Sequence, residues 1–161
     1  MADPVTRLLL DRADVSAVMH RYCTAVDTRD WDLLASCFTA DAEADFRSFG
    51  AREVVRGRDA WVAAVKATVG GLDATQHLTA NHVHRIDGDA AHLTAYLQAV
   101  HWLDNDAGDR EYTVGGFYDI ELVRQPAGED PPWRIRRYAL TVTWARGNRH
   151  ILRLGRKRAE S

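Results

Sequence analysis

The chain has 161 residues, of which 46% are hydrophobic and 27% are charged, and its formal net charge is −2 at pH 7. This length and composition are typical of one soluble globular domain, and a net charge near zero gives no general attraction to nucleic acid. No apolar run is long enough for a secretory signal or a membrane span. We therefore predict a cytoplasmic protein with one domain over residues 1–148 and a solvated basic tail over residues 149–161, and neither a nucleic-acid nor a membrane partner.

The first part of the chain has the spacing of helices. Apolar residues recur every three or four positions over residues 15–26, which predicts a helix whose first turn contains Asp11 and Asp14. After a break at "DTRD", the segment "WDLLASCF" predicts a second, short helix with Asp30 as its N-cap. The only two cysteines, Cys23 and Cys37, form no metal-binding motif, so we expect two buried thiols.

A short strand is predicted in "AEADF", and a third helix in "GRDAWVAAVKATVGG", from Gly57 to the glycine pair at residues 70–71. Beyond this point β-branched and aromatic residues increase, and "DGD", "DNDAGD" and "QPAGEDPP" are turn signals. They predict four strands joined by hairpins, over residues 74–86, 90–103, 111–124 and 133–146.

This order of elements predicts an α+β fold, with three N-terminal helices on the concave face of a curved, mostly antiparallel sheet and a pocket between the two layers. The other face of the sheet is left open. An open face of this kind favours a homodimer or homotrimer.

Four of the seven histidines lie in "TQHLTANHVHRIDGDAAH", residues 75–92. Strand alternation predicts that His77 shares a polar, cavity-facing side with Asn81, while His82 and His84 lie on the opposite side. Asn81 would orient the substrate or water, or form a hydrogen bond at the strand end. His82 and His84 have no further ligand motif, and no glycine-rich phosphate loop is present, so we expect neither a metal nor an organic cofactor.

The segments "RYCTAVDTRDWDLLASCFTADA", "TQHLTANH", "IDGDAAHLTAYLQAVH", "GGFYDIEL" and "WRIRRYALTVTWARGN" resemble the SnoaL-like branch of the nuclear transport factor 2-like superfamily. That resemblance covers nearly the whole chain and implies a cone-shaped α+β fold. The members most similar in these motifs are scytalone dehydratase, bile-acid dehydratase and hexachlorocyclohexane dehydrochlorinase. They eliminate water or HCl with a histidine base that an aspartate holds.

By motif position, the resemblance implies that His77 is the base and that Asp27 holds it. It also implies that Tyr22 donates a hydrogen bond to a substrate oxygen and that His101 protonates the departing hydroxyl; for His101, a buried structural role is the alternative. From residue type we expect Arg146 to clamp an anion or a carbonyl group at the pocket mouth. Aromatic walls for an apolar ring, or alternatively core residues, are expected at Tyr96, Trp102, Phe117, Tyr118 and Trp144.

These features predict a cofactor-independent lyase, most simply a dehydratase that acts on an apolar polyketide, steroid or terpenoid ring. Two alternatives remain open at this point. One is an isomerase or cyclase that uses the same histidine and aspartate, and the other is a noncatalytic module that binds small molecules.

Overall fold

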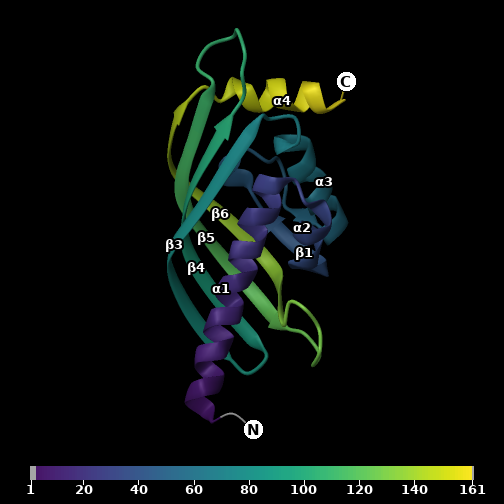
Figure 1. Cartoon of the computed structure of the whole chain (residues 1–161), viewed down its shortest axis with the longest axis vertical. Coiled ribbons are helices and arrows are strands. Elements are labelled where there is room, and N and C mark those ends of the chain that lie inside the picture. The colour runs from purple at the N-terminus through teal and green to yellow at the C-terminus, as the bar shows by residue number, and fades with distance from the viewer. Residues whose placement is uncertain (1–2, 161) are drawn as a thin grey trace.

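The computed structural model describes residues 3–160; residues 1, 2 and 161, which the predicted domain and tail include, lie outside this range. Three helices, α1 (Pro4–Thr28), α2 (Trp31–Ser36) and α3 (Arg58–Val69), precede the long strands, as predicted. In Figure 1 they lie on one side of a curved sheet, with α1 running along it. The fold is therefore α+β, with the predicted order of layers.

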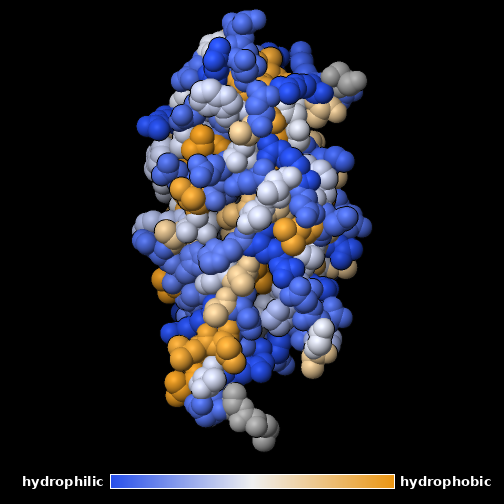
Figure 2. Space-filling model, viewed as in Figure 1, coloured by the Kyte–Doolittle hydropathy of each residue, from blue (hydrophilic) through white to orange (hydrophobic). Residues whose placement is uncertain are grey.

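Helix α1 begins 11 residues before the start of the predicted apolar pattern. Asp3 caps it, accepting hydrogen bonds from the backbone N–H groups of Val5 and Thr6, and Pro4 occupies the first turn. Residues 3–10 are exposed because these turns extend beyond the sheet, so they carry no periodic signal. Their exposed apolar side chains form the patch at the lower end of the molecule in Figure 2. Asp11, expected in the first turn, is instead buried and paired with Arg124 at 2.7 Å.

Local signals predicted the next two helices well. The Asp30 side chain accepts a hydrogen bond from the Leu33 backbone N–H at 2.9 Å and begins α2. Helix α3 lies between Gly57 and Gly70. Between the two helices, the expected short strand is β1 (Phe38–Asp45), followed by the 3-10 turn η1 (Arg47–Phe49) and by β2 (Val55–Arg56), which was not predicted.

The sheet has six strands in the order β2-β1-β6-β5-β4-β3. Its four long strands end within one residue of the predicted positions: β3 (Ala74–Asp87), β4 (Ala90–Trp102), β5 (Glu111–Arg124) and β6 (Trp133–Gly147). These four are antiparallel neighbours, whereas β1 runs parallel to β6. The core lies between the concave face of the sheet and the helices, and its largest fully buried side chains include Trp133, Tyr118 and Tyr138.

The prediction of a solvated basic tail was wrong. Residues 150–160 form a fourth helix, α4 (His150–Glu160), in which Ile151 is fully buried. Gly71 and Gly155 lie so close together that a Cβ atom on Gly71 would collide with the Gly155 carbonyl oxygen. The apolar side of α4 therefore packs over the turn after α3, and the many charged residues between its apolar ones concealed this in the sequence. None of the helices within residues 3–160 is long and apolar enough to cross a membrane.

Candidate active site

A cavity of about 820 Å³ lies between the concave face of the sheet and the helices α1, α3 and α4. Its lining is largely apolar and includes Val26, Trp61, Leu97 and Leu140. Helix α3 contributes residues of its buried side, while β4 contributes alternate residues, because every second side chain of a strand points to the same face. A cavity of this size and character is suited to a cyclic small molecule.

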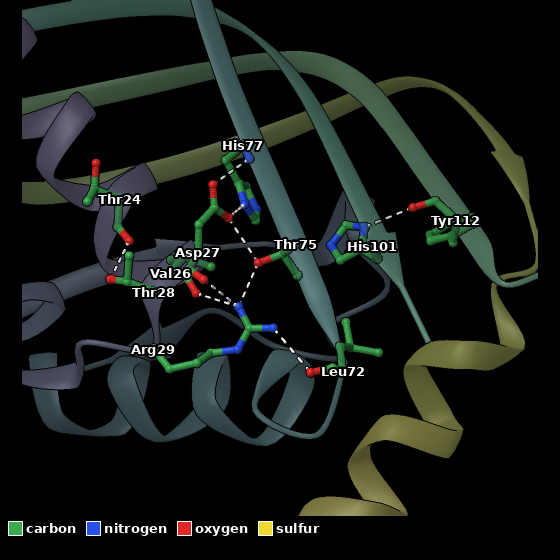
Figure 3. Close-up of polar contacts among 10 residues, drawn as sticks. All are labelled: Thr24, Val26, Asp27, Thr28, Arg29, Leu72, Thr75, His77, His101 and Tyr112. Atoms are coloured by element: carbon green, nitrogen blue, oxygen red, sulfur yellow. Dashed lines mark hydrogen bonds and ion pairs between the residues drawn. The ribbon is translucent and has the colours of Figure 1, made fainter. Parts of the chain in front are cut away.

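His77 and Asp27, which the resemblance linked, are in direct contact. The His77 Nδ1 atom lies 2.7 Å from Asp27 Oδ1, and the His77 backbone N–H donates to Asp27 Oδ2 at 2.8 Å. Asp27 is in the last turn of α1 and His77 is on β3, as Figure 3 shows. Because the carboxylate accepts at Nδ1, this nitrogen carries the proton and Nε2 is left as the basic atom of a cavity-lining ring.

Thr75 also holds the Asp27 carboxylate and is itself held by Arg29; neither residue was singled out from the sequence. The Thr75 hydroxyl donates to Asp27 Oδ1 at 2.9 Å and accepts from Arg29 Nη1 at 2.8 Å. The Arg29 guanidinium also donates to the carbonyl oxygens of Val26, Asp27 and Leu72. Arg29 ends α1 in a left-handed conformation with φ 61°, a placement that no sequence motif indicated.

The electrostatic environment keeps Asp27 ionised. Burial raises the pKa of Asp27, but the hydrogen bonds and charge of His77, together with the Thr75 hydroxyl, lower it more, so that its pKa lies below the usual range. Burial lowers the pKa of Arg29, although an arginine remains charged under all physiological conditions. A carboxylate at this position fixes the tautomer of His77 and stabilises the imidazolium that forms when Nε2 takes a proton.

His101 also lines the cavity, and its ring centroid is 5.8 Å from that of His77. Its Nδ1 atom lies 3.0 Å from the carbonyl oxygen of Tyr112, which can only accept, so Nδ1 must donate. Burial lowers the pKa of His101 to about 4, and the ring is therefore neutral at pH 7. A neutral ring with its proton on Nδ1 has no proton on Nε2, so this arrangement favours the alternative, a buried structural role, over protonation of a departing hydroxyl by His101.

Tyr22 and Tyr118 also line the cavity, as expected for both residues. Their rings meet edge to face, with centroids 6.3 Å apart, and each is at most 3% exposed. Burial raises the pKa of Tyr22 above its usual range, so its hydroxyl stays protonated and is able to donate a hydrogen bond.

A β-bulge in β3 changes the placement of Asn81, His82 and His84. The register with β4 shifts between Ala80 and Val83, and Asn81 at the bulge has φ 52° and is exposed. The expectation that Asn81 lies beside His77 is therefore wrong. Because one extra residue reverses the alternation, His82 and His84 point to the helix side as His77 does.

His82 and His84 bind to α1 rather than to the cavity. The Ser16 hydroxyl lies 2.9 Å from His82 Nδ1 and 2.8 Å from His84 Nε2. Within residues 3–160, no group of three or more histidine, cysteine, aspartate and glutamate side chains is arranged to hold a metal ion.

Five further expected substrate contacts, besides Asn81, lie outside the cavity lining. Tyr96 and Trp102 alternate along β4 with the inward residues Leu97, Ala99 and His101, so they point to the outer face of the sheet. The same correction applies to Phe117, Trp144 and Arg146, which are exposed; the Arg146 guanidinium lies 3.5 Å from Glu111.

Four arginines that the sequence did not assign to the site do contribute to the lining: Arg52, Arg149, Arg153 and Arg156. Three of them follow β6 and come to the cavity only because α4 folds back against α3. A contact between distant segments of this kind leaves no local signal in the sequence.

Comparison with known proteins identifies the type of domain. The family model described as SnoaL-like domain matches residues 7–139. The uncharacterised protein Rv2910c of Mycobacterium tuberculosis is 32% identical over 135 residues, which cover 79% of this chain and 82% of that protein.

Solved structures share the whole fold. The Kfla4162 protein of Kribbella flavida aligns with a TM-score of 0.80 at 28% identity, over 96% of this chain and 99% of that one. A candidate scytalone dehydratase of Novosphingobium aromaticivorans aligns with a TM-score of 0.77 at 19% identity, over 89% and 91% of the two chains. Hexachlorocyclohexane dehydrochlorinases also share the fold, with TM-scores of 0.72 to 0.73 and identities of 15% to 17%.

Proposed function

This chain belongs to the family of SnoaL-like domains, and from that membership and the geometry of its cavity we propose that it is a cofactor-independent lyase, most simply a dehydratase of a cyclic small molecule. The observation that carries the proposal is the 2.7 Å contact between His77 Nδ1 and Asp27 Oδ1 beside an apolar cavity. Solved structures of the same fold that are named as a candidate dehydratase and as dehydrochlorinases support an elimination.

In the proposed reaction, Nε2 of His77 takes a proton from a substrate carbon next to a carbonyl group. The electrons of the broken C–H bond form a C=C bond, while the C–O bond on the neighbouring carbon breaks. The hydroxyl leaves as water with the proton that His77 has taken up, and the ring returns to its neutral form. Asp27 stabilises the imidazolium between the two transfers, and the Tyr22 hydroxyl donates to the substrate carbonyl oxygen as charge develops there.

His101 has a different role in this scheme from the one first expected. With its proton on Nδ1, its Nε2 accepts a hydrogen bond, so it orients a substrate hydroxyl rather than protonating it. The same observation favours a second candidate function. Without a second acid, His77 could return its proton to another carbon of the substrate, which would make the protein an isomerase.

Mass spectrometry distinguishes these reactions. A panel of cyclic β-hydroxy carbonyl compounds would be incubated with the wild-type protein and with His77→Ala, in H2O and in D2O. A product lighter by one water, absent with His77→Ala, is the expected result. A product whose mass is unchanged in H2O and which contains solvent deuterium in D2O would favour the isomerase. Binding without any chemical change would favour a noncatalytic module.

We further propose that the protein forms a homodimer or homotrimer through the outer face of its sheet. Leu78, Val83, Tyr96 and Trp144 are between 46% and 64% exposed there, and a large apolar patch on a soluble protein is typical of an interface.

We also propose a cytoplasmic location, because the two buried thiols suit a reducing compartment. Cell fractionation would test the location.

A further inference from the structure

The mouth of the cavity is rich in positive charge. Arg52, Arg149, Arg153 and Arg156 all line the cavity and are all exposed, which places them where it opens to solvent. Among residues 3–160, Glu160 is the only acidic residue of the lining. Since the whole chain has a net charge of −2, this excess of arginine does not follow from the overall composition.

Within residues 3–160, none of these four arginines forms an ion pair with a carboxylate. Arg149 donates to the Phe49 carbonyl oxygen at 2.6 Å, Arg153 to His150 Nε2 at 3.1 Å, and Arg156 to the Thr68 hydroxyl at 3.5 Å. These partners are all neutral oxygen or imidazole nitrogen atoms, so the positive charges remain uncompensated.

The arginines of strand β6 differ from those at the mouth. Arg134 is paired with Glu129 at 3.0 Å, and Arg136 and Arg137 are both paired with Glu121. These three arginines of β6 are thus neutralised by nearby acids. At the cavity, by contrast, four arginines gather without a paired acid among residues 3–160.

Uncompensated arginines around one opening repel one another, and a concave site with low-dielectric walls concentrates their field on whatever enters. Arginine also binds carboxylate and phosphate oxygens through two parallel hydrogen bonds. The interior of the same cavity is largely apolar, and its polar groups include the rings of His77 and His101 and the hydroxyl groups of Tyr22 and Tyr118. The site therefore combines an apolar interior with a cationic mouth.

We propose that the cavity binds an amphiphilic molecule whose apolar ring system lies against the interior and whose anionic group, a carboxylate or a phosphate, lies among the arginines of α4. The inference rests on the proposed role of this cavity as a small-molecule site, but it does not depend on which reaction His77 performs. It defines the substrate class of that site as anionic.

Two fluorescent probes test the anionic preference directly. They are 8-anilinonaphthalene-1-sulfonate and its uncharged analogue N-phenyl-1-naphthylamine, which have the same rings and differ in the sulfonate. We expect the sulfonate to bind several-fold more tightly, and we expect this advantage to decrease as sodium chloride rises from about 20 mM to about 500 mM. The double variant Arg153→Gln/Arg156→Gln should weaken binding of the sulfonate about tenfold and change binding of the neutral probe less than about twofold.

The matched control is Arg136→Gln/Arg137→Gln, which removes two exposed arginines of β6 and should change neither affinity. Amide chemical shifts of Ala99 and Val114, two inner residues of the lining, would show that the probes occupy the cavity rather than the outer sheet face. Equal affinities for the two probes, or equal effects of the two double variants, would overturn the anionic site and leave the proposed reaction of His77 intact. Failure of both probes to shift these amides would contradict the small-molecule site itself.

Competition identifies the anionic group. 1-Naphthaleneacetate and 1-naphthyl phosphate would each be tested for displacement of the bound sulfonate probe, with 1-naphthaleneacetamide as the neutral reference. Stronger displacement by the acetate assigns a carboxylate, and stronger displacement by the phosphate assigns a phosphate ester. Displacement by the amide as strong as by both anions would overturn the proposal.

Discussion

His77 binds both oxygens of the Asp27 carboxylate, one through its ring Nδ1 at 2.7 Å and the other through its own backbone N–H at 2.8 Å. The backbone contact fixes Asp27 relative to β3, so that the ring contact has little freedom to change. One carboxylate therefore sets both the position and the tautomer of the proposed base.

Removing either partner should abolish or greatly reduce turnover. We expect no measurable rate for His77→Ala, because this variant lacks the imidazole that Asp27 holds and orients. Asp27→Asn should reduce kcat by about a hundredfold to ten-thousandfold, because the amide does not fix the tautomer or stabilise the imidazolium. Tyr22→Phe should reduce the rate less, since water can take the place of a phenol. Steady-state kinetics on a substrate found by the mass-spectrometric screen would measure these effects; near wild-type rates for both His77→Ala and Asp27→Asn would refute the assigned site.

Arg29 should act on the rate through Asp27. Arg29→Asn keeps a side chain that tolerates the left-handed backbone but removes the donors to Thr75 and to three carbonyl oxygens. We expect kcat to decrease with little change in KM, and the free energy of unfolding to decrease by about 1–3 kcal/mol. Arg85→Asn, at an exposed position of β3, is the matched control. If kcat were unchanged while stability decreased, Arg29 would be a purely structural residue.

The helices and strands could be predicted because their signals are local. Asp30 caps α2 through its own side chain, and turn residues bound each hairpin within a few positions. Which face a strand side chain takes was harder to predict. Phe117 and Tyr118 are neighbours on β5 and point to opposite faces, so they could not both line one cavity, and Tyr96 is related to Leu97 in the same way.

The remaining errors have a tertiary cause. The bulge at Asn81 adds one residue to β3 without a glycine to indicate it, and everything beyond it changes face. The arginines of α4 reach the cavity because Gly71 and Gly155 permit a close approach of two segments more than 80 residues apart. Such contacts depend on the assembled sheet and helices, and no stretch of the sequence encodes them by itself.

Charge on the outer sheet face should dissociate the proposed oligomer. Tyr96 and Phe117 are cross-strand neighbours on β4 and β5, and both are exposed. We expect Tyr96→Lys/Phe117→Lys to reduce the mass in solution, measured by light scattering, to the 18.1 kDa of one chain. Leu9→Lys is the matched control, because Leu9 is an equally exposed apolar residue on α1. Dissociation by Leu9→Lys alone would place the interface on α1, and a monomeric wild-type protein would contradict the oligomer.

Chelation should leave the reaction unaffected. The proposed base is a histidine held by a carboxylate, and His82 and His84 are hydrogen-bonded to Ser16. We expect dialysis against EDTA to leave kcat and KM unchanged. Loss of activity that zinc or iron restores would show that a metal takes part, and His82→Gln would then test whether this pair provides its ligands.

The buried imidazole of His101 should make stability depend on pH. Burial lowers its pKa from 6.5 to about 4 in the folded protein, so below pH 6.5 the unfolded chain binds a proton that the folded protein does not. The stabilisation is therefore complete above pH 6.5 and is lost as pH falls toward 4, by about 1.4 kcal/mol per pH unit.

His101→Asn removes the titrating group but keeps an N–H donor for the Tyr112 carbonyl oxygen. Urea unfolding at pH 7, 6 and 5 should show that the wild-type protein loses about 2 kcal/mol more than the variant by pH 5, whatever their difference at pH 7. His82 and His84, whose pKa values burial also lowers, are present in both proteins and cancel from this comparison. Parallel stability curves would mean that the pKa of His101 is not lowered in the folded protein, so that the ring takes up a second proton near pH 6.5 and can again serve as the acid of the reaction.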